Sequence, residues 1–95
     1  MSSAEERCFT VKGRVQGVFF RACTVRWAQQ LGLVGYVKNN ANGTVSVVAQ
    51  GAPSALDQLY LKLKKGSPLS KVTQVDFEQV SDKQELYARF EIIDR

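Results

Sequence analysis

The hydrophobic pattern of the chain changes between strand-like and helix-like spacing in a fixed order, and this order limits the folds available to it. Apolar residues alternate from Arg7 to Lys12, as they do in a half-buried strand. They recur three or four residues apart from Phe20 to Leu31, as on one face of a helix. The two patterns return in the order strand, strand, helix, strand. The sequence therefore predicts a β-α-β-β-α-β arrangement.

Turn and cap residues separate the later segments. Asn42 and Gly43 suit a hairpin turn, Pro53 suits a helix start, and Gly66 suits a helix end. The predicted elements lie at 34–38 (strand), 44–49 (strand), 53–65 (helix) and 72–80 (strand), with a candidate fifth strand at 86–93. The residues expected to face the core are Phe20, Cys23, Trp27 and Leu31 in the first helix, Leu56, Leu59, Tyr60 and Leu63 in the second, and then Thr73, Val75, Phe77, Leu86, Ala88, Phe90 and Ile92.

This order of elements is typical of an α+β, ferredoxin-like sandwich, in which two helices pack on one face of an antiparallel sheet of four or five strands. Residues 1–6 are expected to be a flexible N-terminal tail, and residues 7–95 a single domain. No apolar stretch approaches the about 20 residues of a membrane span, and no apolar segment follows the first charges. We therefore expect a cytoplasmic protein with Cys8 and Cys23 reduced. A monomer is the simplest expectation for its oligomeric state.

Composition removes several kinds of chemistry. The 95 residues include no histidine and two cysteines. Nucleophile pairs that depend on an imidazole, and zinc sites built from histidine or from four cysteines, are therefore excluded. The chain also carries six basic residues and no carboxylate between Arg7 and Leu56. Such a segment suits an anionic ligand, such as a phosphate or a nucleic-acid backbone, although basic residues also serve simply to keep a surface soluble.

The segment from Gly13 to Arg21 joins the first predicted strand to the first predicted helix. Backbone N–H groups in such a glycine-bearing loop can converge on an anion, and the helix start adds unsatisfied donors with a positive dipole end. Gly13 and Gly17 would provide positive φ angles or a close approach of the backbone to the ligand. Arg21 would grip two phosphate oxygens. A tight turn with a surface arginine is the alternative on these residues alone.

Two segments resemble the signatures of the acylphosphatase family. Val11-Lys12-Gly13-Arg14-Val15-Gln16-Gly17-Val18-Phe19-Phe20-Arg21 is similar to the first, and Gly35-Tyr36-Val37-Lys38-Asn39, followed by Gly43, Val45 and Gly51, is similar to the second. The similarity extends from about residue 7 to the end of the chain. It implies an enzyme that hydrolyses acyl phosphates to a carboxylate and inorganic phosphate, with no cofactor and no metal.

The resemblance also implies roles for particular residues. Arg21 matches the phosphate-binding catalytic arginine, and Asn39 the asparagine that orients the attacking water. The backbone amides of Gln16, Gly17, Val18, Phe19 and Phe20 would complete the phosphate-binding loop, with Gly13 and Gly17 as its structural glycines. The implied partners are small acyl phosphates or an acyl-phosphorylated protein, and neither nucleic acid nor membrane is expected. Lys12 and Lys38 flank this region and either steer the substrate or are ordinary solvated strand ends.

Two other functions fit the same predicted topology. A domain with this loop can bind phosphate for regulation without catalysis. An RNA-recognition module shares the order of elements, but it carries stacking aromatic residues on its third strand, and residues 44–49 contain none.

Overall fold

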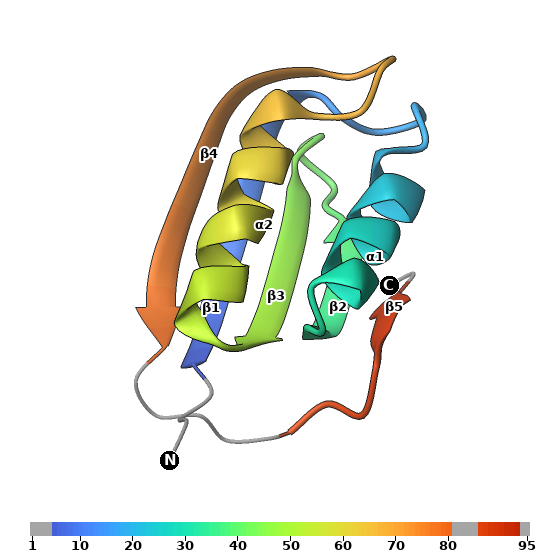
Figure 1. The fold of residues 1–95 in the computed structure, drawn as a ribbon. Helices are drawn as coiled ribbons and strands as arrows, with labels where there is room; N and C mark the ends of the chain where they lie inside the picture. Colours follow the sequence, from blue (N-terminus) through green and yellow to red (C-terminus); the bar gives the residue numbers. More distant parts are fainter. Residues whose placement is uncertain (1–4, 81–85, 94–95) are drawn as a thin grey trace.

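The computed structural model describes residues 5–80 and 86–93, which form a five-stranded sheet with two helices packed on one face (Figure 1). The elements are β1 (Glu5–Arg14), α1 (Phe20–Gln30), β2 (Val34–Asn39), β3 (Val45–Gly51), α2 (Pro53–Lys65), β4 (Lys71–Val80) and β5 (Phe90–Ile92). The predicted order and the ferredoxin-like α+β class are confirmed.

The sheet is mixed, which corrects the prediction of an antiparallel sheet. Its strand order is β4-β1-β3-β2-β5. The pairs formed by β1, β2, β3 and β4 are antiparallel, whereas β5 runs parallel to β2. The reason is topological. The C-terminal end of β4 lies at the same end of the sheet as the start of β2 (Figure 1). A strand that starts from this end of the sheet and lies beside β2 must run in the same direction as β2.

Strand β1 begins earlier than predicted. Glu5 and Glu6 pair with Gly51 and Gln50 of β3, and the side chain of Gln50 donates a hydrogen bond to Glu6 Oε1 over 2.8 Å. These two residues therefore belong to the sheet and not to the expected tail of residues 1–6. The rest of that tail lies outside the described residues.

The first helix packs through smaller residues than its apolar spacing predicts. Phe20, Thr24 and Ala28 are buried, whereas Cys23, Trp27 and Leu31 are only partly buried. Small side chains at these positions let the helix lie close to the sheet, and the Thr24 hydroxyl is satisfied by donating to the Phe20 carbonyl over 2.9 Å. In α2 the predicted Leu56, Leu59 and Leu63 are all fully buried.

A bulge changes which residues of β4 face the helices. Lys12 pairs with Gln74, but the next residue, Gly13, pairs with Val72, so Thr73 is an extra residue in the ladder. Val72 therefore packs against the core, and Thr73, predicted to be inside, is exposed.

The last segment is also less buried than predicted. Phe90 is buried, but Leu86 and Ala88 are exposed and Ile92 is 44% exposed. The described strand here is only three residues long, so alternation cannot extend back to Leu86 and Ala88. The expectation of inward-facing residues was therefore wrong for Leu86 and Ala88, whereas Ile92 lies on the same face of β5 as Phe90 but is only partly covered.

The topology brings three connections to one end of the sheet. The loop from β1 to α1, the turn from β2 to β3 and the connection from α2 to β4 all lie at the top of Figure 1. Asn39 is the last residue of β2, and Arg21 is in the first turn of α1. The two residues predicted to be catalytic are therefore at the same end of the molecule.

Candidate functional site

The loop between β1 and α1 has the backbone shape of an anion-binding nest. Gly17 has φ +74° and Phe19 has φ +60°, whereas Val18 between them does not have a positive φ. Such alternation turns successive N–H groups toward one side. Among the described residues, the amides of positions 16–19 donate no hydrogen bond to a protein atom, and α1 has no side-chain cap at its N-terminus. The loop and the helix start thus offer unsatisfied donors at the positive end of the helix dipole.

The two predicted loop glycines are required for different reasons. Gly13 has φ +125°, and a Cβ at this position would collide with the carbonyl oxygen of Lys71 in β4. Gly17 has φ +74°, and a Cβ there would meet no atom within 4 Å. Gly13 therefore allows the close approach of β1 and β4 at the bulge, and Gly17 provides the left-handed conformation of the loop.

Arg21 is half-buried and lines a cavity of about 330 Å³. The other lining residues are Val15, Gly17, Phe19, Phe20, Ala22 and Ile92. The structure thus brings Arg21 together with several residues of the predicted loop. It adds Ile92 from β5, whose place beside this loop the sequence did not reveal.

Asn39 lies at the end of β2 and is half-buried. Its Oδ1 atom is buried and has no hydrogen-bond partner among the described residues. A buried acceptor without a donor is costly for a folded protein and calls for an explanation, such as a functional role or a bound water. Asn39 does not line the cavity that contains Arg21, so its link to the loop passes through its neighbours in the chain.

Gln16 makes this link with its side chain. Its Nε2 donates hydrogen bonds to the carbonyl oxygens of Asn40 (2.8 Å) and Thr44 (2.9 Å). These two carbonyls are at the two ends of the turn that follows β2, where the Asn40 amide also donates to Thr44 O over 2.8 Å. The predicted role of Gln16 was limited to its backbone amide. The spacing of 24 and 28 residues to its partners gave no sign of this contact.

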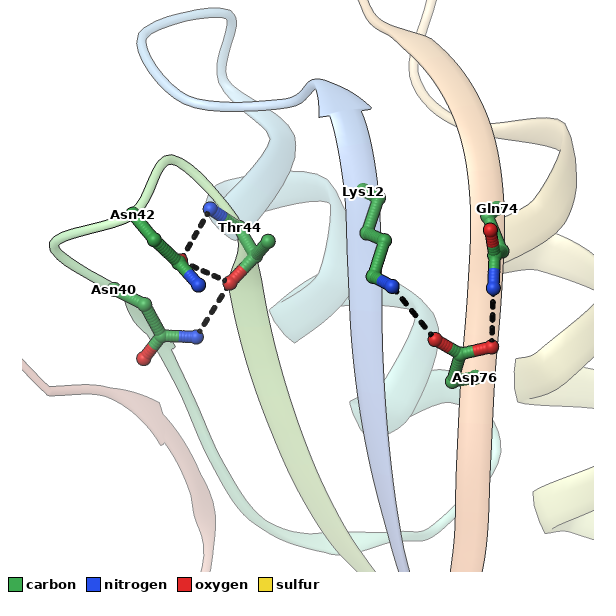
Figure 2. A network of polar contacts seen from close by, with 6 residues as sticks. All are labelled: Lys12, Asn40, Asn42, Thr44, Gln74 and Asp76. Carbon is green, nitrogen blue, oxygen red and sulfur yellow. Dashed lines mark hydrogen bonds and ion pairs between the residues drawn. The ribbon is translucent and has the colours of Figure 1, made fainter.

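The turn from β2 to β3 is held by its own polar side chains (Figure 2). Asn40 Nδ2 donates to Thr44 Oγ1 over 2.9 Å and to Ser46 Oγ over 2.7 Å. Asn42 Oδ1 accepts from the Thr44 amide and hydroxyl over 3.1 Å and 2.7 Å. The turn is therefore a rigid support for Asn39.

Comparison with known proteins now identifies the family. The acylphosphatase family model matches residues 7–92. The chain belongs to the acylphosphatase family. It is 47% identical to the acylphosphatase of Alkalilimnicola ehrlichii over 82% of this chain and 88% of that one. It is 45% identical to the acylphosphatase of Vibrio cholerae over 94% of this chain and 99% of that one.

Solved structures agree with the sequence comparison. The crystal structure of acylphosphatase from Bacillus subtilis matches with a TM-score of 0.90 at 37% identity, covering 94% of this chain and 98% of that chain. The protein is therefore an acylphosphatase, an enzyme that hydrolyses small acyl phosphates. Among the described helices, neither is long and apolar enough to cross a membrane.

Two basic residues of β1 form ion pairs with aspartates from the second half of the chain. Lys12 Nζ lies 3.2 Å from Asp76 Oδ2 of β4 (Figure 2). Hydrogen bonding from Gln74, followed by the contact with Lys12, lowers the pKa of Asp76. Arg7 likewise pairs with Asp57 of α2 over 2.7 Å. The pairing of Lys12 favours the reading of this residue as an ordinary strand residue over a role in steering substrate.

Cys8 lies within β1, between Val48 of β3 and Glu78 of β4. Burial, with smaller contributions from Glu6 and Glu78, raises the pKa of its thiol. A raised pKa leaves less of the reactive thiolate at neutral pH. Cys8 and Cys23 are both free cysteines, and Cys8 has the character of a small packing residue.

A second cavity, of about 510 Å³, lies where α2 ends. Its lining residues are Trp27, Lys62, Lys65, Gly66, Ser67, Pro68 and Ser70. None of them is a residue predicted for catalysis or phosphate binding. Several of the predicted site residues line the smaller cavity beside Arg21 instead.

Proposed function

We propose that this acylphosphatase holds the phosphoryl group of its substrate with the Arg21 guanidinium and the backbone amides of residues 16–20, and that Asn39 orients the attacking water. The observation that carries the proposal is the set of unbonded loop amides beside Arg21 at the uncapped start of α1. Donors fixed by the fold need little reorganisation when charge develops on the phosphoryl oxygens, so they stabilise the transition state more than water does.

The chemistry of an acyl phosphate explains why so few groups are enough. Its leaving group is a carboxylate, whose conjugate acid has a pKa of about 4 to 5, so it departs without being protonated. Water attacks phosphorus in line, a new P–O bond forms, and the bond from phosphorus to the bridging oxygen breaks. The electron pair of that bond stays on the carboxylate. A water proton passes to a phosphoryl oxygen of the substrate, giving a carboxylate and dihydrogen phosphate.

This transition state places specific demands on the protein. Phosphoryl transfer is largely dissociative, so the water is deprotonated late and a strong general base is unnecessary. The absence of histidine from the sequence is compatible with such a reaction. The remaining tasks are to hold the phosphoryl group, to neutralise its charge and to aim the water.

The position of Asn39 supports its proposed role. Its buried Oδ1 has no donor among the described residues, and a water molecule is a donor of suitable size. A water that donates one proton to Oδ1 has its lone pairs directed elsewhere, which fits the requirement of in-line attack. The Gln16 hydrogen bonds to the adjacent turn keep this acceptor at a fixed place relative to the loop.

Measurements of phosphate binding and turnover with Arg21→Ala test the proposal. Loss of a transition-state arginine in phosphoryl transfer lowers the rate by about 10³- to 10⁵-fold, and competitive inhibition by inorganic phosphate should disappear. Arg14→Ala is the matched control, because Arg14 is exposed at the end of β1. It should change kcat/KM by less than about tenfold, or about 1.4 kcal/mol. Full activity of Arg21→Ala contradicts the assignment, and phosphate binding by the wild type without turnover supports a regulatory domain instead.

We further propose that the enzyme acts as a cytoplasmic monomer without nucleic acid. The outward-facing residues of the adjacent strands β1 and β3 include Cys8, Thr10, Ser46 and Val48, which offer no aromatic ring for a base to stack on. Light scattering during gel filtration tests the monomer, and retention on single-stranded RNA at physiological salt tests the absence of RNA binding.

A further inference from the structure

Phe19 combines backbone strain with exposure. It has φ +60°, and among the described residues no other non-glycine residue has a positive φ. A bulky side chain in the left-handed region is unfavourable by about 1–2 kcal/mol. Burial of the ring does not offset this strain, because the side chain is 76% exposed. Strain that the fold maintains without a packing gain is typical of functional positions.

Ile92, near the C-terminal end of the sequence, lines the same cavity as Phe19. It pairs with Val37 in the register of β5 and β2, and it shares a face of the strand with the buried Phe90. Because α1 packs over β2 and β5, this face is directed toward the helix. Ile92 is nevertheless 44% exposed, so part of its side chain remains available at the surface.

Phe19 and Ile92 both line the cavity that Arg21 lines. The remaining lining residues are Val15, Gly17, Phe20 and Ala22. Among the described lining residues, Arg21 thus contributes a positive charge to a wall that is otherwise apolar. The volume of about 330 Å³ lies within the range of small-molecule sites, which typically combine an apolar wall with a few polar groups that fix orientation.

The short distance between the two parts of an acyl phosphate determines where its acyl group can lie in this site. One bridging oxygen separates its phosphorus from the acyl carbon, so an acyl group lies immediately beside the phosphoryl group. If Arg21 and the loop amides hold the phosphoryl group, the acyl group must lie against the adjoining wall. The apolar surface there favours an apolar acyl group by removing it from water.

We propose that Phe19 and Ile92 are the specificity-determining residues of this enzyme and select acyl phosphates with aromatic or other apolar acyl groups over acetyl phosphate. This inference rests on the proposed function of Arg21 and the loop. The exposed Phe19 ring offers a flat face for an aromatic acyl group to stack on, and Ile92 adds a second apolar side chain to the lining of the same cavity. Small polar acyl groups gain little from either contact.

The test compares kcat/KM for benzoyl phosphate and acetyl phosphate in the wild type and in Phe19→Gly. Glycine accepts φ +60° without strain, so this variant should fold and should unfold at a higher temperature than the wild type. The ratio of the two kcat/KM values should fall by about tenfold, the typical effect of losing a modest apolar contact. Any change in the loop that affects phosphate binding acts on both substrates and cancels in the ratio.

Companion variants sharpen this comparison. Phe19→Tyr keeps the aromatic face and should keep the wild-type ratio, and Ile92→Ala should lower the ratio as Phe19→Gly does. Leu61→Ala is the control, because Leu61 is 62% exposed on α2 and does not line this cavity. In this variant the kcat/KM values for benzoyl phosphate and for acetyl phosphate should both remain unchanged.

The outcomes separate this inference from the function on which it rests. Turnover of both substrates with an unchanged ratio in folded Phe19→Gly overturns the selection of the acyl group and leaves the acylphosphatase mechanism intact. A wild type that shows phosphate-competitive turnover of neither substrate overturns the proposed role of Arg21 and this inference together. If Phe19→Gly changes the sedimentation of the protein but not the ratio, Phe19 contacts a second copy of the chain, and the proposal is wrong.

Discussion

The side-chain amide of Gln16 donates to the backbone carbonyl of Asn40 over 2.8 Å. The second proton of the same amide goes to the carbonyl of Thr44 over 2.9 Å. One side chain of the loop after β1 therefore closes both ends of the turn after β2. Because Asn39 directly precedes this turn, Gln16 connects the proposed phosphate-binding loop to the proposed water-orienting group.

Replacement of Gln16 should uncouple these two parts of the site. Gln16→Glu keeps the shape but presents a carboxylate to two carbonyl oxygens, so both hydrogen bonds are lost. We expect the free energy of unfolding to fall by about 1–3 kcal/mol and kcat to fall by about tenfold or more. The inhibition constant for phosphate should change much less than kcat. Urea denaturation and steady-state kinetics measure these effects. Gln16→Met lacks both the donor and the charge, so it is the control for repulsion between the introduced carboxylate and the two carbonyl oxygens. Equal losses in kcat and in phosphate affinity would show that Gln16 acts on the loop alone.

Asn39→Ala should separate catalysis from stability. Loss of one neutral positioning group lowers kcat by about 10²- to 10³-fold. Stability should change little, because the buried Oδ1 has no partner to lose among the described residues. Phosphate should still inhibit with nearly the wild-type constant. A near wild-type kcat on an acyl phosphate would contradict the water-orienting role, and thermal unfolding provides the control for correct folding.

The two loop glycines should respond differently to alanine. Gly17→Ala places a Cβ in open space at φ +74°, so it should cost about 1–2 kcal/mol of stability. Gly13→Ala drives a Cβ into the Lys71 carbonyl at the bulge, and should cost about 3 kcal/mol or more. Guanidinium denaturation of both variants tests the order. If both variants lose the same free energy of unfolding, glycine is needed at position 13 only for its positive φ angle and not for the close approach of β4.

Acid should weaken the contact between Lys12 and Asp76. The Gln74 hydrogen bond and then Lys12 hold the pKa of Asp76 below its ordinary value, so the folded protein binds this proton less tightly than the unfolded chain. The stability from this group is therefore present above the unfolded pKa of about 3.9 and is lost as the pH falls through the lower, folded pKa. Carbon-detected NMR titration of the Asp76 carboxyl measures the folded value. Gln74→Ala and Lys12→Ala should each raise this folded pKa, and a variant that leaves it unchanged would show that the corresponding contact does not lower it.

Local sequence patterns were sufficient for much of the fold and for part of the site. Alternation in β1, the leucine spacing of α2 and the turn chemistry of Asn42-Gly43 depend on residues close in sequence, and all three predictions hold in the structure. Arg21 was placed beside its loop for the same reason. The prediction failed for Thr73, where a bulge against β1 shifts the alternation of β4 by one residue, because a bulge depends on two strands and not on one.

The sequence by itself determined the order of the elements, the glycine-bearing loop and the presence of Arg21 at the start of α1. These features depend on interactions within about one turn or one strand. Only the tertiary structure decided that β5 runs parallel to β2, that Ile92 lies beside Phe19 and Arg21, and that Gln16 closes the turn next to Asn39. Each of these contacts joins segments that are far apart in the chain. Its existence depends on strand order and register, which arise when the whole core packs and leave no local pattern in the sequence.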